Sequence, residues 1–269
     1  RGVDVTYDQY PYPAGATSLV TLLPPWAHDG GIDKLVERLK DPEKARQMRR
    51  DIERWLPDWE NFIGSIGWEN IRVTYVKSEE NKRYEGKDLA EIGRMNGDPE
   101  VYETLFRLII EEKDAAGMVV FSMNEEDIRR IMQHPLHMVG TDAGSCTPTG
   151  PWSFGKPHPR HYGTYPRILG RYVREEGVLN LEDAVRRMTL MPARRFGILD
   201  RGLLKPGMWA DITVFNPDTV IDRATFDNPH QFPKGIEYVI VNGEVTVDSG
   251  KYTGALAGGT LRKNRPIKK

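Results

Sequence analysis

Several features of secreted, membrane-spanning and nucleic-acid-binding proteins are missing from this sequence or rare in it. Cys146 is the single cysteine, which excludes an internal disulfide framework and favours a reducing compartment, so we expect a cytoplasmic protein. No apolar run approaches the roughly eighteen residues of a transmembrane helix. The net charge is −1, and no sustained basic run precedes the tail at 262–269. We therefore expect neither a membrane nor a nucleic acid as a partner.

The start of the chain also lacks an initiator methionine and any signal-peptide pattern. Residues 2–7 (GVDVTY) instead alternate apolar and polar side chains, as a half-buried strand does. We expect a strand at 2–7 and interpret the chain as a piece of a longer polypeptide.

The composition is that of a folded protein with a substantial core, because 39% of the residues are hydrophobic and 29% are charged. Further strands are expected at 71–78, 118–123 and 137–142. The apolar spacing predicts helices at 31–56 (with a break at Asp41-Pro42), 87–97, 98–117, 125–134, 164–177, 181–189 and 192–197. This alternation is typical of parallel βαβ units in an α/β sheet or barrel.

The sequence changes in character after residue 200. Short apolar runs separated by Pro-Gly, Asn-Gly and Ser-Gly steps predict a small β unit, with a hairpin turn at Asn242-Gly243. A closed eight-stranded α/β barrel takes roughly 250 residues, and only residues 1–200 precede this unit. If the architecture is a barrel, the chain holds only its second half.

One acidic residue stands where α/β enzymes keep their chemistry. Asp142 ends the apolar run at 137–141, and mostly helix-averse residues follow it up to the HPRH cluster at 158–161. Side chains at the ends of buried strands meet at one edge of such a fold, where loops complete a site. Asp142 is therefore the leading catalytic candidate, and an aspartate that caps the following turn is the alternative.

Five segments together resemble the N-acyl-D-amino-acid deacylase (D-aminoacylase) family of the amidohydrolase superfamily. Three of them carry motifs, namely DQYPYPAG (8–15), HMVGTDAG (137–144) and KPHPRHYGTYPRILG (156–170). The other two are similar to the closing segments of the superfamily, at 188–218 and 235–262. The HPRHYGTYPRILG pattern is the most specific part, and Thr141 departs from the family by standing where serine is common.

The resemblance implies an α/β fold: the C-terminal half of a metal-dependent amidohydrolase (β/α)8 TIM barrel at 1–200, with a helical insert at about 25–70, and a small β-sandwich segment at 201–269. It also implies zinc, held by a His-x-His pair, a Cys or Glu, two later histidines and an aspartate. No His-x-His pair occurs in this sequence. Only the aspartate carries over, as Asp142, so we expect most zinc ligands upstream of Arg1.

Four residues receive roles from the resemblance and from the chemistry that it implies. Asp142 would touch the metal and act as general base and acid during amide hydrolysis. Arg160 would bind the substrate's carboxylate through its planar pair of donors, with a surface ion pair as the alternative. Tyr10 would donate its hydroxyl near the reacting carbonyl or the carboxylate, and Met123 would line the acyl pocket. Ordinary packing is the alternative for both.

The histidines near Asp142 do not form an obvious metal site of their own. His134 and His137, and likewise His158 and His161, are spaced i, i+3, but a proline follows the first histidine of each pair. Proline at that position weakens a helical ligand geometry. We expect structural roles for these four histidines.

The loop at 143–157 is rich in Gly, Pro, Ser and Thr and has two interpretations. It is either a mobile lid over the site or a stretch of ordered packing. Cys146 lies within it without an obvious paired base, which disfavours a nucleophilic role for the thiol.

The expected function is hydrolysis of the amide bond of an N-acyl-D-amino acid, or a close relative, by metal-activated water with Asp142 as proton shuttle. The expected partners are this small-molecule substrate and the N-terminal half of the barrel, from the same gene or from a second chain. One alternative is another amide or cyclic-amide hydrolase of the superfamily. The other is a non-catalytic half-barrel that needs a complementing chain, because unpaired strand edges and an apolar face favour association.

Overall fold

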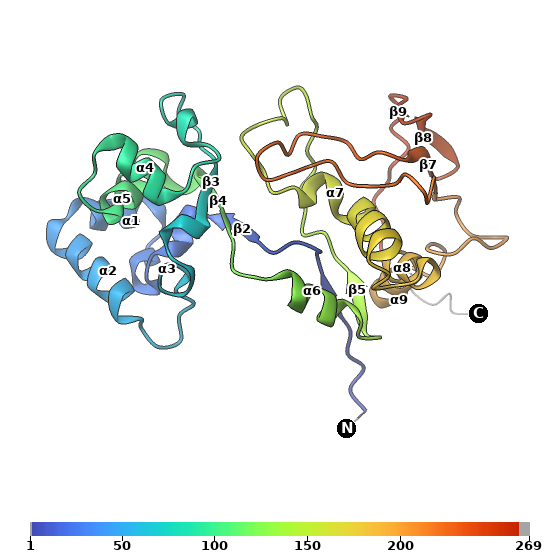
Figure 1. Cartoon of the computed structure of the whole chain (residues 1–269), viewed down its shortest axis with the longest axis horizontal. Coiled ribbons are helices and arrows are strands. Elements are labelled where there is room, and N and C mark those ends of the chain that lie inside the picture. Colours follow the sequence, from blue (N-terminus) through green and yellow to red (C-terminus); the bar gives the residue numbers. More distant parts are fainter. Residues whose placement is uncertain (1, 264–269) are drawn as a thin grey trace.

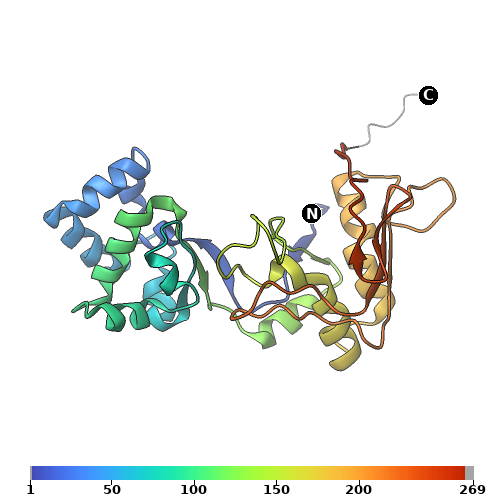
Figure 2. The ribbon, with the colours of Figure 1, turned by 90° about the horizontal axis from the view of Figure 1, so that it is seen from above.

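Residues 2–263 are described by a computed structural model, in which the chain forms two lobes that lie side by side (Figures 1 and 2). We call residues 15–120 the helical lobe, and residues 2–14 together with 121–263 the site lobe. The chain starts in the site lobe, crosses to the helical lobe at strand β2 and returns after strand β4 (Figure 1). The helical lobe is therefore an excursion from the site lobe.

The strands of residues 2–263 form three sheets. They are β1 (Tyr7–Gln9), β2 (Gly15–Ser18), β3 (Ile71–Tyr75), β4 (Gly117–Val120), β5 (His137–Val139), β6 (Ile212–Phe215), β7 (Ile236–Val241), β8 (Glu244–Asp248) and β9 (Lys251–Tyr252). In the site lobe, β1 and β5 form a parallel pair. The order β2-β4-β3 makes an antiparallel sheet in the helical lobe, and β6-β7-β8-β9 makes another after residue 200.

Helices make up much of both lobes. The α-helices are α1 (Ile32–Lys40), α2 (Pro42–Arg54), α3 (Phe62–Ile66), α4 (Leu89–Asn96), α5 (Val101–Glu112), α6 (Glu125–Met132), α7 (Arg160–Arg167), α8 (Leu181–Met188) and α9 (Leu190–Phe196). Short 3₁₀ turns are η1 (Leu19–Leu22), η2 (Pro25–His28), η3 (Trp68–Asn70), η4 (Asn81–Tyr84) and η5 (Lys113–Ala115). The π-helix η6 (Ile168–Glu175) continues α7 directly.

Local sequence explains where several of these elements begin and end. The predicted break at Asp41-Pro42 is confirmed, because the Asp41 carboxylate accepts hydrogen bonds from the first backbone N–H groups of α2 and Pro42 supplies the first helical residue. Helix α4 ends as predicted at Gly97, whose φ of 70° favours glycine. The hairpin predicted at Asn242-Gly243 joins β7 to β8.

The helical lobe has a core of its own. Met118 and Val120 of β4 and Val73 of β3 pack against α5 residues such as Leu105 and Leu108, and all five side chains are buried. Full burial of side chains of this size contributes about 1.5–3 kcal/mol each. The sheet is therefore held by helices of the same lobe.

A separate core in the site lobe places the end of β5. Val139 of β5 packs with Ile128 and Met132 of α6 and with Ile168 and Tyr172 of η6. This packing fixes β5 between two helices, and thereby fixes the start of the loop that carries Asp142.

Two predictions about strands are wrong. The segments 71–78 and 118–123 were expected in parallel βαβ units, but β3 and β4 pair antiparallel. The order of strands and helices leaves the direction of pairing open, and here α4 and α5 return the chain in the opposite direction. The strand expected at 2–7 begins only at Tyr7, because residues 2–6 have no neighbouring strand within the described part of the chain.

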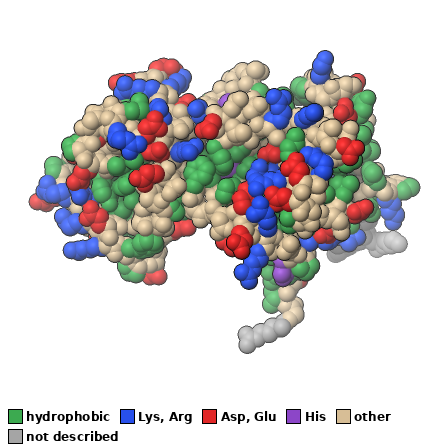
Figure 3. Space-filling model, viewed as in Figure 1, with side chains coloured by type: hydrophobic (Ala, Val, Ile, Leu, Met, Phe, Trp, Pro, Cys, Tyr) green, Lys and Arg blue, Asp and Glu red, His purple; other side chains and the backbone are tan. Residues whose placement is uncertain are grey.

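The surface carries charges of both signs. On the face drawn in Figure 3, acidic and basic side chains are interspersed over both lobes. Among residues 2–263, no helix combines the length and the apolar character that a membrane crossing requires. The cytoplasmic location, the domain boundary at residue 200 and the insert at about 25–70 stay predictions.

Candidate active site

A cavity of about 700 Å³ lies where β1 and β5 end. Its walls come from the two strands, from the segments that follow them and from helices beyond. The lining residues are Asp8, Gln9, Tyr10, Met123, Met138, Val139, Gly140, Thr141, Asp142, Tyr165, Pro192 and Phe196. Because β1 and β5 are parallel, their carboxyl ends lie at the same edge, which is where α/β-barrel enzymes bind their substrates.

Asp142 lies in the wall of this cavity, just past the end of β5. Its side chain is 72% exposed, and its Oδ2 lies 2.8 Å from Nη2 of Arg160. Its backbone is left-handed, with a φ of 46°, a conformation that aspartate adopts more readily than most residues. Because the carboxylate is largely exposed, it can exchange this ion pair for contact with a ligand.

Arg160 is the first residue of α7 and is only 7% exposed. Its guanidinium carbon lies 4.8 Å from the centroid of the Tyr10 ring, which is the geometry of a cation–π contact. Its Nε–H is buried and finds no hydrogen-bond acceptor within residues 2–263. Such an unsatisfied donor costs about 1–3 kcal/mol. Arg160 itself is not among the residues that line the cavity, and it meets the lining through Tyr10 and Asp142.

The structure brings together all four residues that the sequence singled out. Tyr10, Met123 and Asp142 line the same cavity, and Arg160 contacts both Tyr10 and Asp142. Met123 reaches the cavity from the segment between β4 and α6, where its backbone N–H donates to the Pro13 carbonyl at 3.1 Å. Their roles in binding and catalysis stay predictions.

Asp8 is a lining carboxylate that sequence reasoning did not single out. It lies on β1 opposite Met138 of β5, and its side chain fills the space beside Gly140. A Cβ atom on Gly140 would come within 2.7 Å of the Asp8 Oδ1 atom. The signal was present in the sequence, since Asp8 opens the DQYPYPAG motif. Asp8 and Asp142 are thus the two carboxylate residues in the lining.

His158 connects two parts of the site. Its ring is buried, with Nε2 at 2.9 Å from the Ala14 carbonyl oxygen and Nδ1 accepting a 3.0 Å hydrogen bond from the backbone N–H of Arg160. Burial lowers the pKa of His158 to about 3, and the adjacent Arg160 charge acts in the same direction, so the ring is neutral at pH 7. The two hydrogen bonds give His158 a structural role, as the sequence led us to expect. The ring plays this role close to the cavity.

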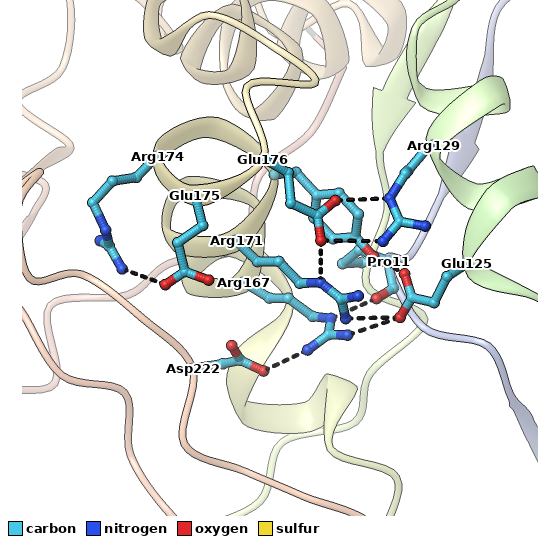
Figure 4. Close-up of polar contacts among 10 residues, drawn as sticks. Pro11, Glu125, Arg129, Arg167, Arg171, Arg174, Glu175, Glu176 and Asp222 are labelled. Atoms are coloured by element: carbon cyan, nitrogen blue, oxygen red, sulfur yellow. Dashed lines mark hydrogen bonds and ion pairs between the residues drawn. The ribbon is translucent and has the colours of Figure 1, made fainter.

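Arg167 is a second residue of the HPRHYGTYPRILG motif that supports the site from behind. Its Nε–H donates to the Pro11 carbonyl at 2.8 Å, and its two other nitrogens reach Glu125 at 3.1 Å and Asp222 at 3.4 Å. Figure 4 shows the guanidinium between these two carboxylates. The contact with Pro11 fixes the loop that carries Tyr10.

A glycine of the same motif allows close packing around this loop. A Cβ atom on Gly163 would lie 2.6 Å from the Tyr12 hydroxyl and 2.8 Å from the Asp222 Cβ. Any larger side chain would push the loop or the Asp222 segment away. Much of the motif therefore serves to hold the segment 10–14 in place.

His161 and His137, from the two His-Pro pairs, also contact neighbouring residues, but the Nε2 atom of His137 is buried without a hydrogen-bond partner within residues 2–263. His161 Nδ1 lies 3.0 Å from the Gly144 carbonyl oxygen. His137 is buried at the start of β5, and burial, followed by the nearby Arg187 charge, lowers its pKa to about 4. Neither histidine lines the cavity.

The loop at 143–157 is packed in an ordered way at its C-terminal end. The Lys156 N–H donates to the Thr74 carbonyl at 2.6 Å, and the Phe154 ring stacks edge-on against Tyr75 of β3. Cys146 in this loop is half-buried, and burial raises the pKa of its thiol, which opposes the thiolate needed for a nucleophile.

The residues described do not form a metal site by themselves. Within 2–263, no group of three or more His, Cys, Asp or Glu side chains has the arrangement of one. Zinc in proteins takes three or four protein ligands, and Asp142 offers a single carboxylate at the cavity. The side chains of residues 2–263 therefore do not fit a zinc ion on their own.

Comparison with known sequences decides the family. The sequence model of the Amidohydrolase family matches residues 75–247. The chain belongs to this family. Among curated relatives, N-acyl-D-glutamate deacylase of Alcaligenes xylosoxydans is 39% identical over 90% of this chain and 38% of its own length. D-aminoacylase of the same organism is 39% identical over 66% of this chain and 34% of its own length.

Solved structures of amidohydrolases share this fold. N-acyl-D-glutamate deacylase from Bordetella bronchiseptica, complexed with zinc and a phosphonate inhibitor, aligns over 96% of this chain with a TM-score of 0.64 and 35% identity. A D-aminoacylase structure aligns over 97% with a TM-score of 0.68 and 31% identity. This chain spans 43% of each of those chains. The expected fold class is confirmed: the C-terminal half of an amidohydrolase (β/α)8 barrel followed by a small β-sandwich segment.

Proposed function

We propose that this chain is part of a hydrolase that cleaves the amide bond of N-acyl-D-amino acids, a carbon–nitrogen bond other than a peptide bond. The observation that carries the proposal is the ion pair of Asp142 and Arg160 at the cavity, with the Tyr10 ring against the guanidinium. The likeness to N-acyl-D-glutamate deacylase and D-aminoacylase supports the same reaction class.

In this proposal, Arg160 binds the carboxylate of the substrate. A guanidinium offers two parallel N–H donors to a carboxylate, and the pair is stronger where water is excluded. Arg160 is buried, and its Nε–H has no acceptor within residues 2–263. Tyr10, held against the same guanidinium, is placed to donate its hydroxyl to the substrate beside it.

Asp142 moves the proton in this proposal. When the substrate's carboxylate occupies Arg160, the Asp142 carboxylate loses part of its ion pair and is available to the reacting centre. It takes a proton from the attacking water and then gives one to the leaving nitrogen, so that one carboxylate serves as base and acid in turn. Its exposure in the cavity wall is consistent with both steps.

A zinc ion belongs to the proposal only together with residues outside the described part of the chain. We propose that the N-terminal half of the barrel, from the same gene or from a second chain, brings most ligands and that Asp142 adds its carboxylate. The zinc in the N-acyl-D-glutamate deacylase structure supports a metal for the family.

The lining of the cavity favours a substrate with an apolar side chain. Met123, Met138 and Phe196 are among its apolar residues, whereas its ionisable carboxylates are Asp8 and Asp142. A second carboxylate on the substrate would meet like charges there, and a like charge within a few ångströms is unfavourable. We therefore propose N-acyl derivatives of apolar D-amino acids, with Met123 in the wall of the pocket.

The experiment compares N-acetyl-D-methionine, N-acetyl-L-methionine and N-acetyl-D-glutamate as substrates of the full zinc-loaded protein. The D-methionine derivative is expected to be the best of the three. An Arg160→Lys variant should raise KM by about 10- to 100-fold, because a lysine cannot form the two-pronged pair. An Asp142→Asn variant should lower kcat by about 10²- to 10⁴-fold with little change in KM.

Arg195 provides the matched control, because its exposed ion pair with Asp4 at 3.0 Å lies outside the cavity lining. Arg195→Lys should leave both constants within about twofold. Equal turnover of all three substrates would refute the preference for apolar D-amino acids. An Arg160→Lys variant with unchanged KM would refute the assignment of the carboxylate site.

A second candidate function follows from the match to D-hydantoinase of Rhizobium radiobacter, 32% identical over 35% of this chain and 23% of its own length. A cyclic amide has no free carboxylate for Arg160 to bind. Turnover of a 5-substituted hydantoin that survives the Arg160→Lys substitution would therefore favour this candidate. If the full protein binds no zinc and turns over neither substrate class, a non-catalytic half-barrel that needs a complementing chain is the remaining candidate.

A further inference from the structure

Among the histidines of residues 2–263, only His158 forms hydrogen bonds both with the backbone of Arg160 and with Ala14, in the segment that follows Tyr10. It is 1% exposed, and its ring meets those of Tyr10 and Tyr12 edge-on, at centroid distances of 5.8 and 5.1 Å. Neither carboxylate binding by Arg160 nor proton transfer by Asp142 uses this ring. Its position raises the question of what a buried, uncharged imidazole does between two parts of a binding site.

The hydrogen bonds of His158 fix its proton. The backbone N–H of Arg160 is a donor, so the Nδ1 atom at 3.0 Å must accept and carries no hydrogen. The Ala14 carbonyl oxygen at 2.9 Å is an acceptor, so Nε2 must carry the hydrogen and donate it. Only the neutral Nε2–H tautomer satisfies both contacts, because a doubly protonated ring would point an N–H at the Arg160 N–H.

Each hydrogen bond holds one functional segment. The bond to the Arg160 N–H satisfies a donor of the first turn of α7, which would otherwise be buried without a partner, and so fixes where that helix begins. The other bond is to the carbonyl oxygen of Ala14, a fully buried residue, and it holds the segment that follows Tyr10. One rigid ring therefore sets the distance between the two segments.

We propose that His158 is a positioning residue that holds Arg160 and Tyr10 in register for a substrate carboxylate. This inference rests on the proposed carboxylate site. A histidine that served packing alone would affect only the stability of the fold. A positioning residue also changes KM and kcat separately, according to which of its two hydrogen bonds is lost.

Two substitutions separate the two hydrogen bonds. In His158→Asn, the amide oxygen can take the place of Nδ1 and keep the bond to the Arg160 N–H, but the side chain is too short to reach Ala14. In His158→Gln, the longer amide can donate to Ala14 in place of Nε2 and loses the bond to Arg160. Each variant thus releases one segment and keeps the other.

The expected results differ in kind. His158→Gln should raise KM by about tenfold with kcat within about threefold, because the start of α7 and with it Arg160 shifts. His158→Asn should lower kcat by about tenfold with a smaller change in KM, because Tyr10 is released. Both are measured with N-acetyl-D-methionine on the full zinc-loaded protein.

His134 is the matched control. It also precedes a proline, and its Nδ1 also accepts from the N–H two residues on, that of Leu136, at 3.3 Å, but the residue is exposed and outside the cavity lining. His134→Asn and His134→Gln should leave KM and kcat within about twofold. If the His158 variants behave like them, or if His158→Asn and His158→Gln change both constants equally, the positioning role is wrong.

A readout without catalysis keeps the inference testable if the proposed function fails. The ring nitrogens of His158 should give the ¹⁵N NMR signature of the Nε2–H tautomer at pH 7 and keep it at pH 5. The Arg160 side-chain Nε–H signal should shift in His158→Gln and stay in place in His134→Gln. A His158 ring that titrates near pH 6.5, or an Arg160 signal unmoved in His158→Gln, would overturn the inference whether or not the protein is active.

Discussion

The helical lobe and the site lobe differ in how completely they bury their own side chains. The three-stranded sheet of the helical lobe is covered by helices of that lobe, and Leu105 in its core has no exposed surface. In the site lobe the parallel sheet has two strands, and large apolar side chains such as Leu204 and Leu256 are 75% and 90% exposed. Parallel sheets are normally covered on both faces and continued by further strands.

The difference indicates which half of the structure is self-sufficient. The helical lobe has what an independent folding unit needs, whereas the site lobe presents strand edges and apolar surface that favour association. The candidate site lies in the less complete lobe. This agrees with the chain spanning 43% of its solved relatives.

The largest expected effect is on amide hydrogen exchange. Backbone amides of β3 and β4 in the helical lobe should exchange roughly 10³-fold more slowly than those of β1 and β5 in the site lobe. The physical reason is that the larger core of the helical lobe must open before the amides of β3 and β4 can exchange. The measurement is native-state exchange of the purified chain at pH 7. Equal protection of β4 and β5 would remove the distinction between the lobes.

A core truncation tests whether the helical lobe unfolds as its own unit. Leu105→Ala should lower the free energy of unfolding of that lobe by about 2–5 kcal/mol, through lost apolar burial and a cavity. The exchange rates of β5 should stay unchanged. Leu204→Ala is the control and should change stability by less than about 0.5 kcal/mol. Destabilisation of both lobes to the same degree by Leu105→Ala would show one cooperative unit.

Acidification should act on the site lobe. His137 and His158 have folded-state pKa values lowered to about 4 and about 3, mainly by burial, from an unfolded value near 6.5. Their contribution to stability is complete above pH 6.5 and is lost as the pH falls towards the folded values, because the unfolded chain binds the protons first. Between pH 6.5 and pH 5, each of the two histidines should lower the free energy of unfolding of the site lobe by about 2 kcal/mol.

The measurement is urea unfolding at pH 7 and pH 5, followed by the methyl NMR signals of Val139 in the site lobe and Val73 in the helical lobe. The helical lobe holds one histidine, His28, whose side chain is partly exposed. The urea midpoint of the helical lobe should therefore change little between pH 7 and pH 5. A larger acid shift for Val73 than for Val139 would contradict the expected histidine effect.

The smallest effect concerns a close contact in the site lobe. Gly163→Ala should destabilise it by about 1–3 kcal/mol, because the new methyl would press on the Tyr12 hydroxyl and on Asp222. Gly258→Ala is the matched control, since a Cβ there meets nothing within 4 Å. Thermal unfolding of the two variants gives the comparison, and equal melting temperatures would show that the segment moves aside freely.

The sequence predicted those features of the fold that depend on a few neighbouring residues. The Asp41-Pro42 break, the end of α4 at Gly97 and the Asn242-Gly243 hairpin follow from capping and turn preferences of a few neighbouring residues. The antiparallel pairing of β3 with β4 could not be predicted from the sequence. It depends on how the connection between them folds back, which is a property of the whole helical lobe.

The candidate site shows the same division. Asp142 and Arg160 were recognisable from the motifs that contain them, and the structure places them 2.8 Å apart. The contribution of His158 and Arg167 was not apparent, because each acts through a backbone carbonyl more than a hundred residues away in the chain. A sequence motif shows which residues are present but not which distant backbone atoms they hold.

The sequence by itself therefore determined the kinds of elements, the ends that capping and turn residues mark, and the family, because these depend on side-chain chemistry and spacing within short stretches. Only the tertiary structure decided strand direction, the neutral tautomer of His158 and the incomplete cover of the site lobe. Those features depend on which buried donors and acceptors meet across the fold, and a buried polar group is stable only when its partner is in place.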